Sequence, residues 1–329
     1  MNKKHAKSPC CGAKTVRFGM RRRQCKQCKK TWRIRKKKRG RKERRDTISI
    51  LVKFLNHKTA TLASMAEARK VSSSTMQERI AKLLDRFLMK TAWPPIPEGP
   101  LVMVADARVK YVEGGWFTGH FFFLRSIRGT DASILEPFWR PGTETTAGWR
   151  LAFDSLSPDV MGRVVALTCD GHNGLVYEAR YRGWLLQRCH AHLIMRIQSR
   201  RSRWYSSQHK AEGEEIYRLV KRALTEPNEQ ALQPILSRIE EMGWQTSSPD
   251  LRRTLLGFVT NHQDWRTYLK HLDLNLPTTN NTAESFGSCV NELVHRARGF
   301  RSRTALIKWI AALIKNKKTL KCRGAHQPN

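Results

Sequence analysis

The chain has 329 residues, of which 40% are hydrophobic, so it is long enough for two or three domains with cores of their own. Its 62 Lys and Arg residues against 27 Asp and Glu give a formal net charge of +35, a field that attracts polyanions such as nucleic acid. No stretch approaches the roughly 18 consecutive apolar residues of a membrane span, and MNKKHAKSPCC lacks the apolar core of a signal peptide. We therefore expect a cytoplasmic protein, whose eight cysteines are metal ligands or core residues rather than disulfides.

Residues 1–32 carry four cysteines in a small basic segment, which predicts a zinc ribbon. The first pair lies in SPCCG, where Ser8 stands at the position of the first thiolate of a C-P-x-C-G pattern. We expect structural Zn²⁺ on Cys10, Cys11, Cys25 and Cys28. One ligand stays open, because adjacent cysteines share an ion less easily and His5 is an alternative. A degraded ribbon without metal is the other interpretation.

Residues 33–45 form a basic linker, in which ten of thirteen residues are Lys or Arg. Such a segment binds phosphates even as a solvated tether, and Arg39 and Arg41 can enter a minor groove. Residues 46–92 then show the apolar periodicity of three helices, the third beginning at a capping box of Thr75 and Glu78. This order resembles a helix-turn-helix DNA-binding domain, whose third helix would read a major groove through Gln77, Arg79 and Lys82. A packing or dimerising helix is the alternative.

A proline-rich linker, residues 93–100, precedes a change of pattern. The apolar runs LVMVAD, VKYV and GHFFFLRSI predict three strands, the last two joined by a glycine turn. A helix in TTAGWRLAFDSL, a strand in RVVALTCD, a short helix and a strand in WLLQRC follow. The order β-β-β-α-β-α-β predicts an α/β domain. Residues 190–275 are mostly helical and basic, and two further helices follow them.

Two aspartates end apolar runs, Asp106 after LVMVA and Asp170 after VVALTC. Open α/β sheets present functional groups at the carboxyl ends of their strands, so we expect these carboxylates to lie close together. Carboxylates suit Mg²⁺ or Mn²⁺, and two such ions can stabilise the attacking and leaving oxygens of a phosphoryl transfer. The plainer interpretation is that each aspartate only caps the loop after its strand.

A third acid, Glu284, follows TTNNTA, where Asn281 or Thr282 would cap a helix whose first turn holds the carboxylate. A simple capping-box glutamate is the alternative.

Four motifs, VMVADAR, ALTCDGHNGL, QRCHAH and TTNNTAESF, occur in this order. Together they resemble bacterial insertion-sequence transposases of the DDE class, in the Mutator-like branch, over about residues 100–315. The resemblance implies an α/β fold: a ribonuclease-H-like catalytic core of residues 101–189 and 276–320, interrupted by a helical insertion domain of residues 190–275. It also implies that Asp106, Asp170 and Glu284 are the catalytic residues and bind two Mg²⁺ or Mn²⁺ ions.

The same resemblance places other residues beside the active site. The family's Cys-x-x-His motif matches Cys189 and His192, and its lead-in to the last acid matches Thr279 with Asn280 or Asn281. Cys189 and His192 make only half of a zinc site, which His190 or His172 would have to complete, so we do not expect zinc there. Basic clusters flanking the site predict DNA contacts from Arg200, Arg201, Arg298 and Arg301.

The sequence thus predicts a bacterial or archaeal, nucleoid-associated DNA transposase that binds element ends and target DNA, as a homodimer or larger assembly. Two other functions stay open. One is an inactive or domesticated DNA-binding regulator, and the other is a structure-selective nuclease on the same fold.

Overall fold

The structure is a computed structural model that describes residues 7–19, 22–33, 47–56, 60–198, 207–297, 299–300 and 302–325. The chain divides into two compact units, Met1–Asp46 and Thr47–Asn329. Across the described segments, every helix is too short or too polar to cross a lipid bilayer.

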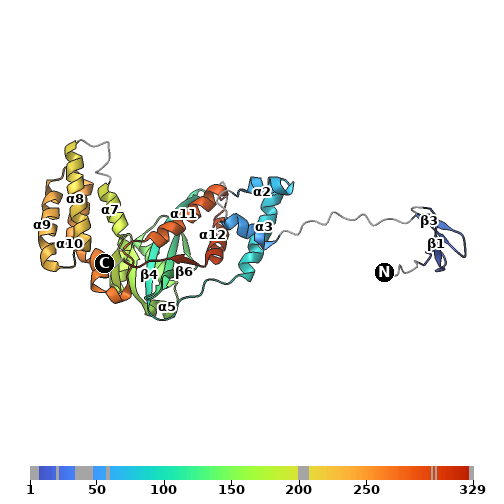
Figure 1. Ribbon diagram of the computed structural model, residues 1–329, viewed down its shortest axis with the longest axis horizontal. Coiled ribbons are helices and arrows are strands. Elements are labelled where there is room, and N and C mark those ends of the chain that lie inside the picture. Colours follow the sequence, from blue (N-terminus) through green and yellow to red (C-terminus); the bar gives the residue numbers. More distant parts are fainter. Residues whose placement is uncertain are drawn as a thin grey trace. The chain divides into compact units, whose positions relative to one another are not determined.

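The first unit contains a three-stranded antiparallel sheet of β1 (Thr15–Arg17), β2 (Arg22–Cys25) and β3 (Thr31–Arg33), seen in blue in Figure 1. Of its described residues, only Ser8, Thr15 and Cys25 are buried. A unit this small buries little apolar surface, so its hydrophobic core contributes little to its stability.

The second unit begins with α1 (Ile48–Asn56), α2 (Leu62–Arg69) and α3 (Ser73–Lys90), which confirm the three predicted helices. The predicted start of the third is wrong. Ser72 is the N-cap, and its hydroxyl accepts a hydrogen bond from the Thr75 amide at 3.2 Å. Ser72 has extended backbone while Thr75 is already helical, so the earlier hydroxyl in the SSST run takes the capping position.

A mixed sheet forms the centre of this unit. It contains β4 (Leu101–Val112), β5 (Gly115–Ser126), β6 (Asp131–Ile134), β8 (Val164–Cys169), β9 (Leu185–Arg188) and β10 (Thr319–Lys321), in the order β10-β6-β5-β4-β8-β9. A further strand, β7 (Phe138–Pro141), pairs with β5. The pairs from β10 to β4 are antiparallel, whereas β4–β8 and β8–β9 are parallel. The predicted α/β class is confirmed.

The runs LVMVAD and VKYV, predicted as two strands, form the single strand β4. Its hairpin to β5 turns at Glu113 and Gly114, which both have positive φ, as a two-residue turn of a twisted hairpin requires. Asp106 therefore lies within a strand and does not end one. The reason is that β4 continues past its parallel neighbour as half of a long hairpin.

The two faces of the sheet are covered by different helices. Phe121 and Phe123 of β5 belong to the hydrophobic cluster that includes α11 (Asn281–Arg296) and α12 (Arg303–Lys317). Phe122 and Leu124 alternate with them and pack on the opposite face. That face is covered by α4 (Thr146–Asp154), α5 (Pro158–Arg163) and α6 (Asn173–Tyr181). This alternation is the two-residue period of a strand buried on both sides.

The predicted helical segment after residue 190 consists of α7 (His190–Gln198), α8 (Ser207–Thr225), α9 (Glu229–Gln245) and α10 (Pro249–Lys270), followed by the 3-10 helix η2 (Leu272–Leu274). In Figure 1, α8, α9 and α10 lie side by side, and with α7 they share a hydrophobic cluster of their own. The last turns of α10 contact the edge strand β9: the Tyr268 amide donates to Gln187 Oε1 at 2.9 Å. The carboxyl end of α10 thus covers the edge strand β9.

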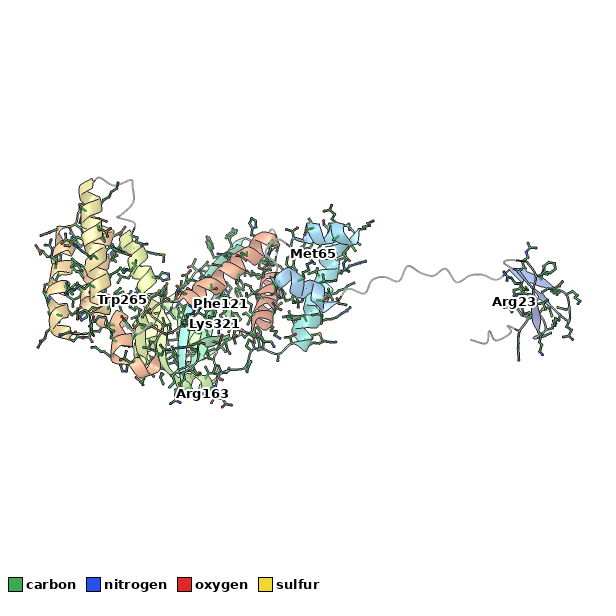
Figure 2. All side chains as sticks on the ribbon, viewed as in Figure 1. Arg23, Met65, Phe121, Arg163, Trp265 and Lys321 are labelled. Atoms are coloured by element: carbon green, nitrogen blue, oxygen red, sulfur yellow. The ribbon has the colours of Figure 1, made fainter. Side chains whose placement is uncertain are left out.

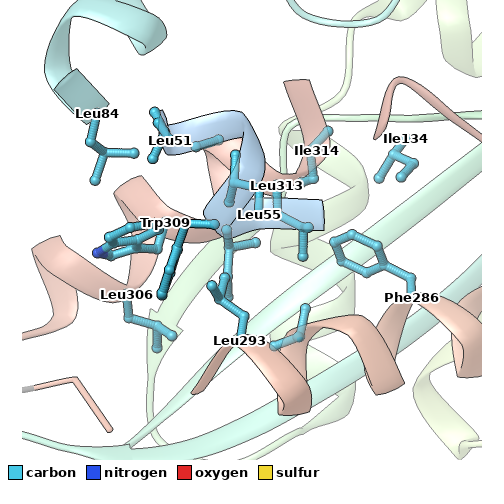
Figure 3. Close-up of a cluster of buried hydrophobic side chains, with 14 of the residues drawn as sticks. Leu51, Leu55, Leu84, Ile134, Phe286, Leu293, Leu306, Trp309, Leu313 and Ile314 are labelled. Atoms are coloured by element: carbon cyan, nitrogen blue, oxygen red, sulfur yellow. The ribbon is translucent and has the colours of Figure 1, made fainter. Parts of the chain in front are cut away.

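The helices α1 and α3 share a core with α11 and α12 (Figure 3). Leu51 and Leu55 from α1 lie with Leu293 from α11 and with Trp309 and Leu313 from α12. The proline-rich segment 93–100 is non-helical, as predicted, and is held to the sheet by a hydrogen bond of 2.6 Å from Ser133 Oγ to the Pro95 carbonyl. The first three helices and the sheet are therefore one compact unit. The predicted domain boundaries inside it stay predictions.

Candidate active site

Asp106 and Asp170 come from adjacent parallel strands. The last parallel pair between β4 and β8 is Val104 with Thr168, and each aspartate follows two residues later in its own chain direction. Asp170 begins the loop after β8, where its Oδ1 accepts a hydrogen bond from the His172 amide at 2.9 Å. The sheet therefore places the two aspartates at equivalent positions of neighbouring strands, although only Asp170 is at a strand end.

Glu284 is brought to the same edge of the sheet by hydrogen bonds from its lead-in segment. The His190 amide donates to the Thr278 carbonyl at 2.8 Å, and the Asn280 amide donates to Cys189 Sγ at 3.3 Å. Thr168 Oγ1 donates to the Pro277 carbonyl at 3.3 Å. These bonds join the segment before α11 to the carboxyl ends of β8 and β9. Glu284 lies in the first turn of α11, as predicted.

The cap expected from Asn281 or Thr282 is wrong. The helix begins at Asn281, and its N-cap is Asn280, whose side chain makes no capping hydrogen bond. Asn280 is fully buried, and neither its Oδ1 nor its Nδ2 has a partner among the described residues. Asn281 is exposed. The backbone bond to Cys189 fixes where the helix starts, so the tertiary contact overrides the local capping preference.

One arginine contacts two of the acids. Nη2 of Arg108 lies 2.7 Å from Asp106 Oδ2 and 3.6 Å from Glu284 Oε2. The same nitrogen lies 3.4 Å from the Ala283 carbonyl on α11. Room for this guanidinium comes from Gly287, because a Cβ at that position would overlap it. Arg108 thus places a positive charge between carboxylates that come from separate segments of the chain.

The carboxyl group of Asp106 is strongly perturbed. Burial raises its pKa to about 7; Arg108 lowers that pKa, whereas Asp170, Glu284 and Glu144 raise it. Its Oδ2 is buried and, despite the close approach of Arg108, has no aligned hydrogen bond. Three neighbouring carboxylates therefore act on Asp106, and removal of its proton is costly unless a cation compensates the charge.

Hard oxygen donors converging around a buried, under-compensated carboxylate match the ligand chemistry of Mg²⁺ or Mn²⁺. The ligand atoms of the three acids nevertheless do not all lie within 4.8 Å of one another. In the described part of the chain, the group of three or more candidate ligands that meets this distance is the cysteine cluster of the first unit. The three carboxylates match a divalent ion in ligand type and in location, and the Arg108 guanidinium lies between two of them.

The family model for Mutator-family transposases matches residues 132–320, more than half of the chain. The chain belongs to this family. The match includes Asp170 and Glu284 and begins after Asp106. No curated protein matches the chain at a significant level.

In this transposase, Cys189 and His192 lie beside the acids. Cys189 is buried, and burial raises the pKa of its thiol, whose sulfur accepts the Asn280 hydrogen bond. His192 Nε2 lies 3.4 Å from Glu284 Oε1. His190 does not join them: its Nε2 lies 2.6 Å from the Trp265 carbonyl, and burial lowers its pKa to about 4. Cys189 holds the backbone of the lead-in, and His192 contacts the third acid directly.

The four cysteines of the first unit gather as predicted. Sγ of Cys10 lies 3.0 Å from that of Cys28, and Sγ of Cys11 lies 3.2 Å from that of Cys25. All four sulfurs lie within 4.8 Å of one another, so the cluster could hold a zinc ion. Ser8, at the position of the missing thiolate, is buried, and its hydroxyl lies 3.4 Å from Cys11 Sγ. The alternative ligand His5 lies outside the described residues.

The predicted DNA contacts are only partly within the described residues. Gln77 and Lys82 are exposed on α3, and Arg79 is half-buried. The other six predicted arginines lie outside the described part of the chain: Arg39, Arg41, Arg200, Arg201, Arg298 and Arg301.

Three residues at the site were not singled out by the sequence: Arg108, Glu144 and Arg188. Glu144 Oε1 accepts a hydrogen bond of 2.7 Å from Trp149 Nε1 and lies 3.7 Å from His172 Nδ1. Arg108 is part of the motif VMVADAR, so its place two residues after Asp106 on the same face of β4 was a usable signal. Arg188 likewise stands in the motif QRCHAH, directly before Cys189, whereas Glu144 lies outside all four motifs.

The shifted pKa of Asp106 predicts how stability depends on pH in the absence of divalent metal. Between about pH 4 and 7, the folded state holds a proton that the unfolded carboxyl, with a pKa of about 3.9, has released, so stability falls as the pH rises. Asp106→Asn should abolish this loss, which we expect to be on the order of 2–4 kcal/mol. Thermal unfolding in EDTA from pH 5 to 8 measures it.

Asp273→Asn, at an exposed position in η2, is the matched control and should follow the wild-type profile. An Asp106→Asn profile parallel to that of the wild type would show that Asp106 does not carry the shift.

Proposed function

We propose that this transposase cuts DNA at the ends of its element and joins them to target DNA by metal-dependent, in-line phosphoryl transfer. The observation that carries the proposal is the convergence of Asp106, Asp170 and Glu284 from three separate segments, in a chain of the Mutator family. We assign the metal-binding role to these three carboxylates. The family implies the use of divalent metal and DNA as substrate.

The strand arrangement supports a ribonuclease-H-like core. Strands β6, β5 and β4 are antiparallel neighbours, and β8 and β9 continue the sheet in parallel beyond β4. The helices α7–α10 would then be the insertion, entering after β9 and ending before the lead-in to Glu284.

Each residue of the site has a role in this proposal. A bound pair of Mg²⁺ ions would supply a lowered pKa for the attacking water or 3′-hydroxyl and compensation for charge on the leaving oxygen. Asp106, Asp170 and Glu284 would hold the ions, and His192 would orient Glu284 through their 3.4 Å contact. Cys189 and Asn280 would fix the helix that carries Glu284, through the hydrogen bond between them. No covalent protein intermediate is needed.

DNA docking is assigned to the basic and helical front of the chain. The net charge of +35 supports binding to phosphates, and the exposed Gln77 and Lys82 of α3 are available for contacts with base edges. In this interpretation α1–α3 are a helix-turn-helix. Holding two element ends calls for a dimer or larger assembly.

Conservative changes in the acids test the catalytic assignment. Asp106→Asn and Glu284→Gln should each reduce Mg²⁺-dependent cleavage of terminal element DNA by at least about 10³-fold, because each removes a charge needed to hold metal. Binding of the same DNA in EDTA should change by less than about threefold, a difference below 1 kcal/mol. Gel-based cleavage and strand-transfer assays, with DNA taken from the regions that flank the gene, provide both measurements.

Glu292→Gln, two turns further along α11, is the control and should stay active. Strand transfer retained in either acid variant would refute the assignment. Cleavage by the wild type without joining would favour a structure-selective nuclease, and specific binding without Mg²⁺-dependent cleavage would favour a regulator.

Arg108 provides a second test, which needs no catalysis. Its guanidinium contacts Asp106 and Glu284, so in metal-free protein it compensates charge that a divalent ion would otherwise compensate. Arg108→Gln should therefore lower the thermal midpoint in EDTA and raise the affinity for Mn²⁺ severalfold, because the competing cation is gone. Differential scanning fluorimetry and Mn²⁺ titration followed by electron paramagnetic resonance measure these effects.

Lys110→Gln removes a charge two residues further along β4, where Lys110 Nζ bonds Asn291 at 2.7 Å, and should leave Mn²⁺ affinity unchanged. A lower Mn²⁺ affinity in Arg108→Gln would mean that Arg108 arranges the carboxylates for the ion rather than competing with it.

We also propose that the four clustered cysteines bind one structural Zn²⁺, since the first unit has so small a core. Purified protein should contain about one zinc per chain, and Cys25→Ser should lose most of it. Elemental analysis by mass spectrometry measures the content. Cys289→Ser, on α11 and outside the cluster, should retain the ion. Zinc-free wild-type protein with a folded first unit would rule the proposal out.

A further inference from the structure

A pocket lies against the proposed catalytic residues, between the end of the sheet and the helices α7 and α10. It is lined from three directions: by the loop after β8, by the end of β9, and by those two helices. Its lining is rich in cations and includes Asp170, Arg188, His192, Arg196, Arg253 and Trp265. We call it the Arg188 pocket.

Arg188 is the central side chain of this pocket. Its guanidinium carbon lies 3.8 Å from the centroid of the Trp265 ring, a stacking contact. Trp265, which is labelled in Figure 2, is a buried residue of α10. Gly171, directly after Asp170, lies against the guanidinium as well: it has a φ of +94°, and a Cβ there would overlap Arg188. Two distant segments therefore form a slot for one planar cation.

The guanidinium of Arg188 makes no hydrogen bond or ion pair with any residue in the described part of the chain, and its Nε is buried without a partner. Burial is the largest cause lowering the pKa of its guanidinium, whereas Cys169, Asp264 and Asp170 raise that pKa. A buried donor such as Nε is normally satisfied, so this guanidinium is suited to an anion that enters the pocket.

The geometry favours a phosphate as that anion. A guanidinium presents its donors in a fork that matches two phosphate oxygens. Arg196 and Arg253 add positive charge to the lining. The Arg253 side chain is 82% exposed, and its ion pair of 3.7 Å with Asp250, which is 91% exposed, is a surface pair. A DNA strand whose scissile bond lies at the acids would have its neighbouring phosphates within reach of a pocket that shares Asp170 with them.

We propose that the Arg188 pocket binds one backbone phosphate of the cleaved DNA strand, next to the scissile bond. The proposal rests on the transposase function above and assigns that site a substrate-positioning subsite. Because the pocket contacts a phosphate and no base, it would fix the register of the strand over the acids without reading sequence.

Single-phosphate neutralisation tests this directly. Terminal element DNA is prepared with one neutral methylphosphonate at each position around the cleavage site, and binding is measured in EDTA. In the wild type, one position should weaken binding roughly 10-fold, the loss of a charge-assisted contact. Arg188→Gln should weaken binding of unmodified DNA by a similar factor, and should show no further loss at that position. Its slope of log affinity against log salt should fall by about one.

Two variants guard against misinterpretation. Arg238→Gln removes an exposed arginine of α9 that pairs with Glu215 and Glu241, and should keep the wild-type pattern. Arg253→Gln removes an exposed cation of the pocket that folding does not require, and should reduce sensitivity at the same phosphate. It keeps the proposal testable if Arg188→Gln fails to fold.

Wild-type sensitivity at every position in both pocket variants would overturn the proposal. So would a pocket that binds inorganic phosphate, detected by phosphorus NMR and lost in Arg188→Gln, without coupling to any DNA phosphate. Binding is measured without metal, so the two proposals fail separately. If Arg188→Gln removes the sensitivity at one phosphate but the wild type does not cleave DNA, the pocket proposal holds and the catalytic proposal is rejected. If the wild type cleaves DNA but Arg188→Gln removes no such sensitivity, the pocket proposal is rejected and the catalytic proposal holds.

Discussion

The hydrogen bonds between the carboxyl ends of β8 and β9 and the segment before α11 are the constraint on which the site depends. Thr168, Cys189 and His190 bond the chain between Pro277 and Asn280. The bonded residues are far apart in sequence: 109 residues for Thr168–Pro277, 91 for Cys189–Asn280 and 88 for His190–Thr278. These contacts join the chain just before α7 to the chain after α10. The helices between them can therefore form a hydrophobic cluster of their own without moving Glu284. The same bonds explain why α11 starts at Asn281 without a side-chain cap. Local capping energy of about 1 kcal/mol is small beside the contacts that fix this junction.

The acids repel one another where they converge, and Arg108 compensates part of their negative charge. Asp106 is buried near Asp170, Glu284 and Glu144, and its raised pKa expresses the cost of that position. Arg108 reaches Asp106 and Glu284 only because Gly287 leaves room on α11. Arg188 shows the opposite imbalance: its guanidinium is stacked on Trp265 in a pocket that also contains Asp170, and its buried Nε has no partner among the described residues. Excess negative charge at the acids and clustered cations in the pocket suit a substrate complex of metal and phosphate better than either component alone.

The sequence predicted the strands and helices well where their periodicity is long, as in α3, α11 and α12, and it failed where pairing decides the outcome. LVMVAD and VKYV are one strand because β5 pairs along both, which no local pattern shows. The short strands β6, β7 and β10 of the central sheet were not predicted, since three or four residues carry too little pattern. Glu284 was predicted from motif order, whereas the positions of Arg188 and Glu144 depend on contacts with Trp265 and His172 that only the fold creates. Cys10 and Cys11, which adjacency made doubtful as joint ligands, both face the cluster because Cys28 and Cys25 approach them separately.

The shared core of α1, α3, α11 and α12 links the proposed DNA-reading helix to the third acid by packing rather than by a tether. The Phe54 ring packs on Trp309, with 5.1 Å between the centroids and the planes tilted by 56°. Buried Arg296, at the end of the helix that carries Glu284, donates a hydrogen bond to the Phe54 carbonyl. Interiors packed to this density do not deform continuously, so α3 cannot be displaced from α12 without opening the cluster in Figure 3. DNA held on the exposed face of α3 would therefore meet acids at a fixed position.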